Sequence, residues 1–433
     1  MERYDNYKDS GVDWIGQIPE KYSVTKLKYL SNLFGRIGFR GYNSDDLNQE
    51  GVGAITISPS NITETRLDLS KVTYLSWDKY YESPEIQVCN NDILLVKTGS
   101  SYGKSCYVSN LAVPATINPQ LLRIVPKCFY KFLYYYLQSF FFTYEINCCV
   151  AGSTIPTLSQ ANIGGIYVVI PSTDEQKAIA TYLDEETGKL DAAVEKLERM
   201  VEVLKERKQL IISKAVTRGL DDSVPLKDSG VEWIGHIPEH WNQLQLKYLV
   251  SCNDDVLPES TKNQLIKYVE ISDVDSTSGI KQFTIYNFAD APSRARRITN
   301  IGDIIVSTVR TYFKAIARVD QDDLVVSTGF AVLRAKNIDR NFLFYSLLNE
   351  TFLQQVIAYS YGVSFPAITS KELLRIKLNI PPLSEQQAIA AYLDEKVGKL
   401  DEAIEKQLRM IELLKERKQI LISDVVTGKI KVA

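Results

Sequence analysis

Apolar residues recur at alternating spacings of four and three in two long stretches of the chain, one in each half. In residues 173–216, heptad position a holds Ala180, Thr187, Val194, Val201 and Lys208, and position d holds Leu183, Leu190, Leu197, Leu204 and Ile211. In the second half, position a holds Ala390, Val397, Ile404, Ile411 and Lys418, and position d holds Leu393, Leu400, Gln407, Leu414 and Leu421. About five uninterrupted heptads in each stretch predict two long coiled-coil helices.

The two helices are expected to pair with each other in antiparallel orientation. A parallel, in-register pair would set Lys208 against Lys418 inside the seam, where like charges are costly, whereas antiparallel pairing separates them. About 44 residues at 1.5 Å per residue give each helix a length of roughly 66 Å, which would place the intervening regions at opposite ends of a rod. The alternative of two unrelated amphipathic helices, each packed on its own domain, stays open at this point.

The regions before the two helices show a mixed pattern. Short apolar runs, ILLV at 93–96 and IIVS at 304–307, predict buried strands. An aromatic-rich helix is expected after each, over FLYYYLQSFF and FLFYSLLNETFL, followed by a loop into a last strand. This order predicts a small α+β domain in each half.

The two halves repeat one another. Residues 8–30 and 227–249 are identical at 15 of 23 positions, and residues 170–220 and 380–430 at 31 of 51, whereas the stretches between these blocks have diverged. A duplicated domain with two different inserts predicts a pseudo-two-fold protein that recognises two unlike targets. The expected boundaries are 1–170 and 220–380 for the two recognition domains with their anchor segments, and 171–219 and 381–433 for the two helices.

Composition places the chain among ordinary globular proteins. It has 433 residues, 45% hydrophobic and 24% charged. We expect no signal peptide, because the first residues contain no apolar core, and no membrane span, because the apolar run at 132–142 is too short. The six cysteines show no CxxC spacing, which favours reduced thiols and a cytoplasmic location. The net charge of −3 argues against wholesale binding of a polyanion, so any nucleic-acid contact must come from local basic patches.

One segment imitates a phosphate-binding loop. Residues 97–105, KTGSSYGKS, follow a predicted strand, but only three residues separate Gly99 from Gly103 where a P-loop needs four. The residues that follow are expected to be extended and so offer no helix N-terminus to a phosphate. Nucleotide binding is therefore disfavoured.

Loops after the predicted strands supply the candidate DNA contacts. The first loop offers Lys97, Ser100, Tyr102 and Lys104. Of these, we match Lys97, Tyr102 and Lys104 with Arg310, Tyr312 and Lys314 in the second half. Further candidates are Arg36 and Arg40 beside glycines, the cluster of Arg294, Arg296 and Arg297, and Thr154 and Ser364 in the loops at 152–158 and 362–368. Cationic and aromatic side chains of this kind contact phosphates and base edges. A solvated hairpin or charged loop remains the alternative for each residue.

Catalytic and metal-binding patterns are missing from the sequence. The only histidines, His236 and His240, are separated by Pro238, which breaks a helical metal pair. The sequence also contains no Gly-rich dinucleotide loop and no Asn-Pro-Pro-aromatic motif for amino-group methylation. The segments around Trp14 and Trp233 are interpreted as structural anchors.

The whole chain resembles the specificity subunit of a type I restriction–modification system. The resemblance depends on WIGxIPExx…LKYL, which opens each half, and on IPxxxEQxAIAxYLDExxGKLDxAxEK…LKERKQ, which closes each half. It implies two target recognition domains joined by an antiparallel pair of helices, a bipartite double-stranded DNA target, and docking of two modification subunits. The cofactor S-adenosylmethionine would bind those partners, and none is expected in this non-catalytic chain. The resemblance leaves open two additional restriction subunits with nuclease and translocase activity.

Two other functions are weighed against this interpretation. The first is a coiled-coil scaffold whose two divergent domains bind proteins, which the net charge of −3 favours. The second is an NTPase built on residues 97–105. A steep salt dependence of DNA binding would separate the main interpretation from the scaffold.

Overall fold

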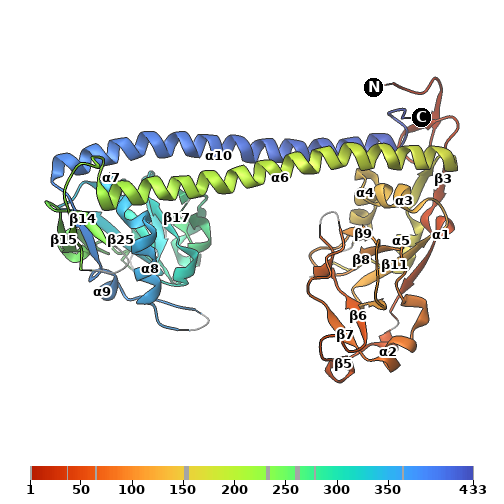
Figure 1. The fold of residues 1–433 in the computed structure, drawn as a ribbon, viewed down its shortest axis with the longest axis horizontal. Coiled ribbons are helices and arrows are strands. Elements are labelled where there is room, and N and C mark those ends of the chain that lie inside the picture. The colour runs from red at the N-terminus through yellow and green to blue at the C-terminus, as the bar shows by residue number, and fades with distance from the viewer. Residues whose placement is uncertain are drawn as a thin grey trace. The chain divides into compact units, whose positions relative to one another are not determined.

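The computed structural model describes residues 2–36, 38–63, 66–150, 156–230, 235–258, 264–276, 279–362 and 365–432. The chain forms two compact units (Figure 1). Unit 1 consists of Met1–Leu197 together with Arg409–Ala433, and unit 2 consists of Glu198–Leu408. The two predicted long helices are present as α6 (Thr173–Arg218) and α10 (Leu383–Val426), and each is divided between the units.

The centre of unit 1 is an antiparallel sheet with the order β4-β11-β8-β9. Its strands are β4 (Ser31–Gly35), β8 (Ile93–Val96), β9 (Ser105–Tyr107) and β11 (Leu121–Pro126). A second sheet, β10-β6-β7-β5, contains β5 (Leu47–Asn48), β6 (Ala54–Ile57), β7 (Thr73–Leu75) and β10 (Ala115–Ile117), with β6 and β10 parallel. Short pairs join β1 (Tyr7–Asp9) to β2 (Gln17–Pro19) and β3 (Ser23–Lys26) to β12 (Tyr167–Ile170).

Unit 2 has a central sheet of the same order although its sequence has diverged, whereas its second sheet has its fourth strand at the opposite edge. Its central sheet, β16-β25-β22-β23, contains β16 (Val250–Cys252), β22 (Ile304–Ser307), β23 (Ile316–Arg318) and β25 (Phe330–Ala335). The second sheet, β20-β17-β24-β21, contains β17 (Leu265–Val269), β20 (Thr284–Asn287), β21 (Ala295–Ile298) and β24 (Leu324–Ser327). The short pairs are β13 (Leu226–Asp228) with β14 (His236–Pro238), β15 (Asn242–Gln245) with β26 (Lys377–Ile380), and β18 (Val274–Asp275) with β19 (Gly279–Ile280).

The predicted strand ILLV is β8, and its burial on both faces explains the unbroken apolar run. Ile93 and Leu95 point into the core beneath the helices, whereas Leu94 and Val96 point into the core shared with the second sheet. Successive side chains of a strand alternate between its faces, so a strand between two cores needs an apolar residue at every position. The predicted strand IIVS is β22 and is buried in the same way.

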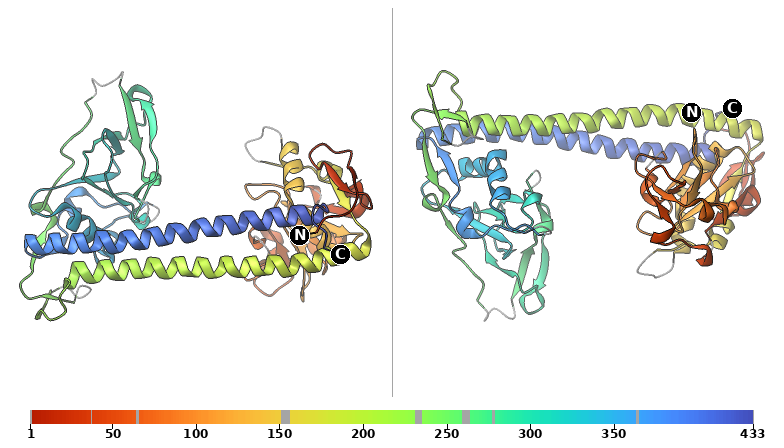
Figure 2. Two further views of the ribbon diagram at one scale, coloured as in Figure 1. Left: turned by 90° about the horizontal axis from the view of Figure 1, so that it is seen from above. Right: turned by 60° about the horizontal axis from the view of Figure 1, so that its bottom comes forward.

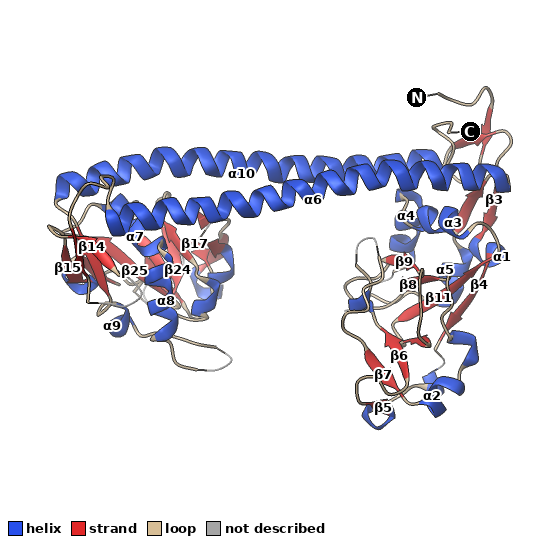
Figure 3. Ribbon diagram, viewed as in Figure 1, coloured by secondary structure: helices blue, strands red, loops and turns tan. Residues whose placement is uncertain are grey.

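The aromatic-rich segment of each unit forms two helices, and the expectation of a single helix was wrong (Figure 3). In unit 1 they are α3 (Tyr130–Leu137) and α4 (Phe140–Cys149), and in unit 2 they are α7 (Arg340–Leu348) and α8 (Glu350–Ala358). The break comes from N-caps: Ser139 Oγ accepts from the amide of Phe142, and Asn349 Oδ1 accepts from the amide of Thr351. Smaller helices are α1 (Leu27–Leu30), α2 (Trp77–Tyr81), α5 (Gln160–Gly165) and α9 (Ser370–Leu373).

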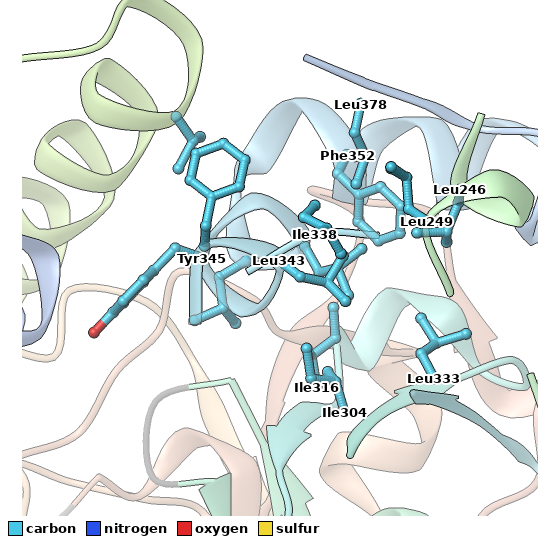
Figure 4. Close-up of a cluster of buried hydrophobic side chains, with 14 of the residues drawn as sticks. Leu246, Leu249, Ile304, Ile316, Leu333, Ile338, Leu343, Tyr345, Phe352 and Leu378 are labelled. Carbon is cyan, nitrogen blue, oxygen red and sulfur yellow. The ribbon is translucent and has the colours of Figure 1, made fainter. Parts of the chain in front are cut away.

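Each unit has its own apolar core, in which the long helices take part. Figure 4 shows the core of unit 2, where Ile304 and Leu333 of the sheet lie near Leu343 of α7 and Phe352 of α8. Ile389 of α10 is fully buried in the same core. The anchor segment of unit 1 behaves as predicted: Trp14 Nε1 donates to Glu145 Oε1 at 3.1 Å. Trp233 lies outside the described residues.

The two helices pair in antiparallel orientation within each unit (Figure 2). In unit 1, Leu183 near the start of α6 shares a core with Val425 near the end of α10. In unit 2, Ala215 near the end of α6 shares a core with Leu393 near the start of α10. All predicted a and d positions are buried or half-buried, which confirms the predicted seam.

Repeated polar residues of the helices fasten the globular part of each unit. The side-chain oxygen of Gln176 accepts from the backbone amide of Phe129 at 3.0 Å, and that of Gln386 accepts from the amide of Asp339 at 2.8 Å. These glutamines belong to the motif EQxAIA, which occurs once in each half. In each unit, the glutamine of this repeated motif therefore links the long helix to the globular domain by the same kind of hydrogen bond.

Candidate nucleic-acid interface

In each unit, the loop after the central strand is hydrogen-bonded to a second loop. In unit 1, the amide of Gly99 donates to Pro156 O at 3.1 Å, and the amide of Leu158 donates to Lys97 O at 2.8 Å. In unit 2, the amide of Arg310 donates to Pro366 O and the amide of Ile368 donates to Thr308 O, both at 2.8 Å. We call 97–104 with 156–158 the paired loops of unit 1, and 308–315 with 365–368 the paired loops of unit 2.

The paired loops of unit 1 contain two lysines, a serine and a tyrosine among the candidate residues. Ser100 and Lys104 are exposed, whereas Lys97 is half-buried, and burial lowers the pKa of its ammonium group. Tyr102 is held in place, because its hydroxyl donates to Asn147 Oδ1 of α4 at 2.8 Å. The structure thus brings these four candidate residues together in one loop, while Thr154 lies outside the described residues.

The paired loops of unit 2 present a cluster of cationic and aromatic side chains. The guanidinium of Arg310 lies over the ring of Phe365, with 4.8 Å between its central carbon and the ring centroid. Tyr312 and Phe313 are about half exposed, with their ring centroids 4.5 Å apart. Lys314 Nζ lies 2.7 Å from Glu350 Oε1. Ser364 lies outside the described residues.

Sequence reasoning missed the aromatic part of this cluster. Phe313 and Phe365 are 53% and 59% exposed, and Tyr361 is 70% exposed. Clustered apolar side chains exposed to water often mark an interaction site, so a run of aromatic residues in a loop could have indicated this part of the interface. The segment YSYGVSF at 359–365 contains it, but only the position of Phe365 beside Arg310 makes it part of the site.

The arginines of unit 1 have partners within the fold. Arg36 is buried, with 6% of its surface exposed, and burial lowers the pKa of its guanidinium. Its Nε donates to Ile117 O at 3.2 Å and its Nη2 to Thr116 Oγ1 at 3.0 Å. Arg40 lies 3.6 Å from Glu85. Arg36 therefore holds β10 against the end of β4, a structural role.

The arginine cluster of unit 2 lies on β21 and the turn before it. Arg294 is exposed and pairs with Glu270. Arg296 lies over the ring of Phe288 at 4.7 Å. Arg297 is half-buried and donates to Asn253 Oδ1, and burial lowers the pKa of its guanidinium. Each member thus has a partner within its own unit.

Strand register corrects the equivalence between the two loops. Leu95 pairs with Ser105 across β8 and β9, and Val306 pairs with Ile316 across β22 and β23. Residue 97 is therefore equivalent to 308, Gly99 to Arg310, and Gly103 to Lys314. The sequence-based match of Lys97, Tyr102 and Lys104 with Arg310, Tyr312 and Lys314 was out of register, because similar residue types and not strand pairing guided it.

The P-loop-like segment and the two histidines do not form the sites that their sequence patterns imitate. The segment after residues 97–104 is strand β9, as expected, so the loop does not lead into a helix as a P-loop does. His236 lies on β14, and His240 Nε2 lies 2.8 Å from Glu385 Oε2. Within the described ranges, no three His, Cys, Asp or Glu residues gather as metal ligands, and no helix is long and apolar enough to cross a bilayer.

Comparison with known proteins agrees with this architecture. The family model for the type I restriction modification DNA specificity domain matches residues 21–199 and again 241–413. The MjaVIII specificity subunit of a type I restriction enzyme from Methanocaldococcus jannaschii is 26% identical, covering 80% of this chain and 81% of that protein. The MjaIX subunit of the same organism is 22% identical over 96% of this chain and 95% of its own length.

A solved structure has the same fold. It comes from work on complex assembly and conformational transition of the type I R-M system. Its TM-score with this chain is 0.64 at 17% identity, covering 95% of this chain and 99% of that one. Because the family model matches twice, once around each recognition region and its helix, the chain belongs to the type I restriction–modification specificity subunits, which recognise DNA and are not themselves enzymes.

Proposed function

We propose that the two units recognise the two halves of an asymmetric, bipartite DNA sequence through their paired loops. One observation carries this proposal: the paired loops have the same backbone hydrogen bonds in both units but different side chains. A shared frame with a variable surface suits two readers that dock on DNA in the same way and select different bases. The two half-sites should therefore be unlike, and the whole target not a palindrome.

The long helices supply a surface for a partner present in two copies. Heptad positions g and c of α6 expose Met200, Val203 and Leu210, which are 50%, 56% and 71% exposed. The same positions of α10 expose Met410, Leu413 and Ile420, at 44%, 50% and 54%. We call these two sets the outer stripes; each is offset by 210 residues from the other. A second apolar seam on a coiled-coil helix calls for a further helix beside it.

We assign one modification subunit to each outer stripe, because equal stripes favour equal partners. S-adenosylmethionine would bind the modification subunits, and the complex would act in the cytoplasm. Two restriction subunits would join the same assembly in systems that cleave DNA. In this arrangement the chain contributes target choice and scaffolding.

Exchange of the recognition regions tests the proposal. Residues 31–150 are replaced by a second copy of 250–360, so that β4 and β16 supply the junctions at their first residues. The variant complex should methylate a symmetric site built from two copies of one half-site, as measured by methylome sequencing. Methylation of the original asymmetric motif would contradict it.

Salt dependence separates DNA recognition from the alternative of a protein-binding scaffold. The complex with modification subunits should lose affinity for its methylated motif steeply as salt rises, because phosphate contacts release counterions. A gel shift at several salt concentrations measures this slope. Binding that is absent or insensitive to salt would favour the scaffold. The exposed aromatic cluster would then contact a protein partner, in keeping with the net charge of −3.

A further inference from the structure

We propose that Arg310 recognises a guanine in the half-site of unit 2, that its backbone is strained for this purpose, and that Phe365 positions its guanidinium. The inference rests on the proposed function and assigns one base and one side chain within it.

The backbone at Arg310 has a conformation that favours glycine. Its φ is +53°, and that of Lys314 is +50°. At the equivalent positions of unit 1 stand Gly99, with φ +103°, and Gly103, with φ +84°. The loop therefore requires a positive φ at two places, and unit 1 meets the requirement without a Cβ. A long side chain in the left-handed region is uncommon, and such outliers gather at functional sites.

Hydrogen bonds impose this conformation on unit 2. The amide of Arg310 donates to Pro366 O at 2.8 Å, and the amide of Phe313 donates back to Arg310 O at 2.9 Å. Thr311, which is 3% exposed, anchors the turn through a 2.8 Å hydrogen bond between its Oγ1 and Ser360 Oγ. The strain at residue 310 is thus held by its surroundings and would persist without the arginine side chain.

Of the two strained cations, only Arg310 is available to a ligand. Lys314 is paired with Glu350, whose carboxylate neutralises its charge. Burial raises the pKa of the Glu350 carboxyl, but the contact with Lys314 lowers it, and the pKa as a whole is lowered. Arg310 is exposed, and within the described part of the chain its guanidinium has an aromatic ring and not a carboxylate as its neighbour.

Stacking on Phe365 prepares the guanidinium for one kind of contact. A guanidinium held over an aromatic ring, with no carboxylate partner among the described residues, keeps N–H groups for a ligand, and these match the O6 and N7 acceptors of guanine in the major groove. Holding the side chain in place also reduces the entropy lost on binding. Phe365 is therefore a positioning residue, and Arg310 the base-contacting one.

The test replaces Arg310 by glycine, which the backbone prefers. Arg310→Gly should raise the melting temperature of the complex while it loses selection of one guanine by about tenfold to a hundredfold. Stability and recognition then move in opposite directions, which a residue that only supports the loop would not produce. Asp323→Gly is the matched control, since Asp323 also has a positive φ, +61°, in an exposed turn of unit 2. It should leave the target unchanged.

The base contact is checked with the complex on DNA carrying 7-deazaguanine at each guanine of the unit 2 half-site in turn. One substitution should weaken the wild-type complex and leave Arg310→Gly unaffected. Phe365→Ala should show a smaller loss at the same base, and Arg310→Gly/Phe365→Ala should lose no more than Arg310→Gly. If the wild-type complex selects guanines that Arg310→Gly still selects, the inference is wrong and the proposed function stands. If the wild-type complex shows no sequence selection, the proposed function itself fails.

Discussion

Lys208 of α6 forms a bidentate ion pair with Asp401 of α10: its Nζ lies 2.7 Å from Oδ1 and 2.9 Å from Oδ2. The side chain of Lys208 is only 7% exposed. The same pair occurs in unit 1, where Lys418 Nζ lies 2.7 and 2.8 Å from the oxygens of Asp191. Each lysine belongs to the motif KERKQ of one repeat, and each aspartate ends the motif GKLD of the other. Two repeated motifs therefore recognise one another across the helix pair.

Removal of the carboxylate should destabilise the helix pair. Asp401→Ala leaves the buried ammonium of Lys208 without its counter-charge, which should cost about 2–3 kcal/mol, somewhat less than for a fully buried pair because Asp401 is 40% exposed. Urea unfolding measures the change. Glu402→Ala, at the neighbouring exposed position, is the control and should change stability by less than about 0.5 kcal/mol. Adding Lys208→Met to Asp401→Ala should recover most of the loss; a double variant as unstable as the single one would contradict the role of the pair.

Lys104 and Arg36 should respond differently to removal. Lys104 is exposed in the paired loops of unit 1, so Lys104→Ala should weaken binding to all sequences alike and reduce the salt slope by about one. Arg36→Ala should instead lower the melting temperature, because it removes the hydrogen bonds to Thr116 and Ile117 in the interior. Titrations at several salt concentrations and thermal unfolding of both variants separate the two effects. A reduced salt slope for Arg36→Ala with unchanged stability would show that Arg36 contacts DNA and does not have the structural role.

Charges on the outer stripe and in the inner seam should have separable effects. Leu210→Glu lies on the stripe at 71% exposure, so it should leave the free chain stable and abolish docking of one modification subunit. Ile420→Glu is its equivalent for the other subunit. Leu204→Glu lies at position d, half-buried in the seam, and should destabilise the helix pair by several kcal/mol. Size-exclusion chromatography with light scattering, together with thermal unfolding, distinguishes these results. A full complex with Leu210→Glu would show that partners dock elsewhere.

Shortening both helices tests whether they set the spacer of the target. Removal of 191–197 and 401–407 would delete Asp191 and Asp401 and leave both seam lysines unpaired. Deleting 192–198 and 411–417 instead keeps both ion pairs, because these heptads face one another in the register the pairs define. Each helix then shortens by about 10.5 Å, equivalent to roughly three base pairs.

The shortened chain should lose the original target and gain one with the same half-sites and a shorter spacer. Three base pairs is nearly a third of a turn of duplex, so the original spacing would present its half-sites on different sides. Methylome sequencing reports both motifs directly. As a control, conservative substitutions within 192–198 at unchanged length should keep the original spacer. A folded deletion variant that methylates only the original motif would show that helix length does not set the spacing.

Periodic patterns of apolar residues predicted the secondary structure that side-chain burial determines. The heptads of α6 and α10 and the strands β8 and β22 are all present, because each follows from the burial of side chains at a regular spacing. The break between α3 and α4 was not predicted, although Ser139 is a good N-cap, because the apolar run continues through it. The candidate DNA residues were chosen by chemical type alone, and type does not distinguish the buried Arg36 from the exposed Arg310.

The sequence by itself determined the duplication, the helix pair and the family, since a repeat, a heptad seam and a motif are properties of residue order. Only the tertiary structure decided which residues face one another across the repeats. Lys208 meets Asp401 because antiparallel pairing joins the end of one helix to the start of the other. Arg310 takes the place of Gly99 because strand pairing, and not residue similarity, aligns the two loops. Contacts between distant segments depend on register, and register is settled by how whole sheets and helices pack.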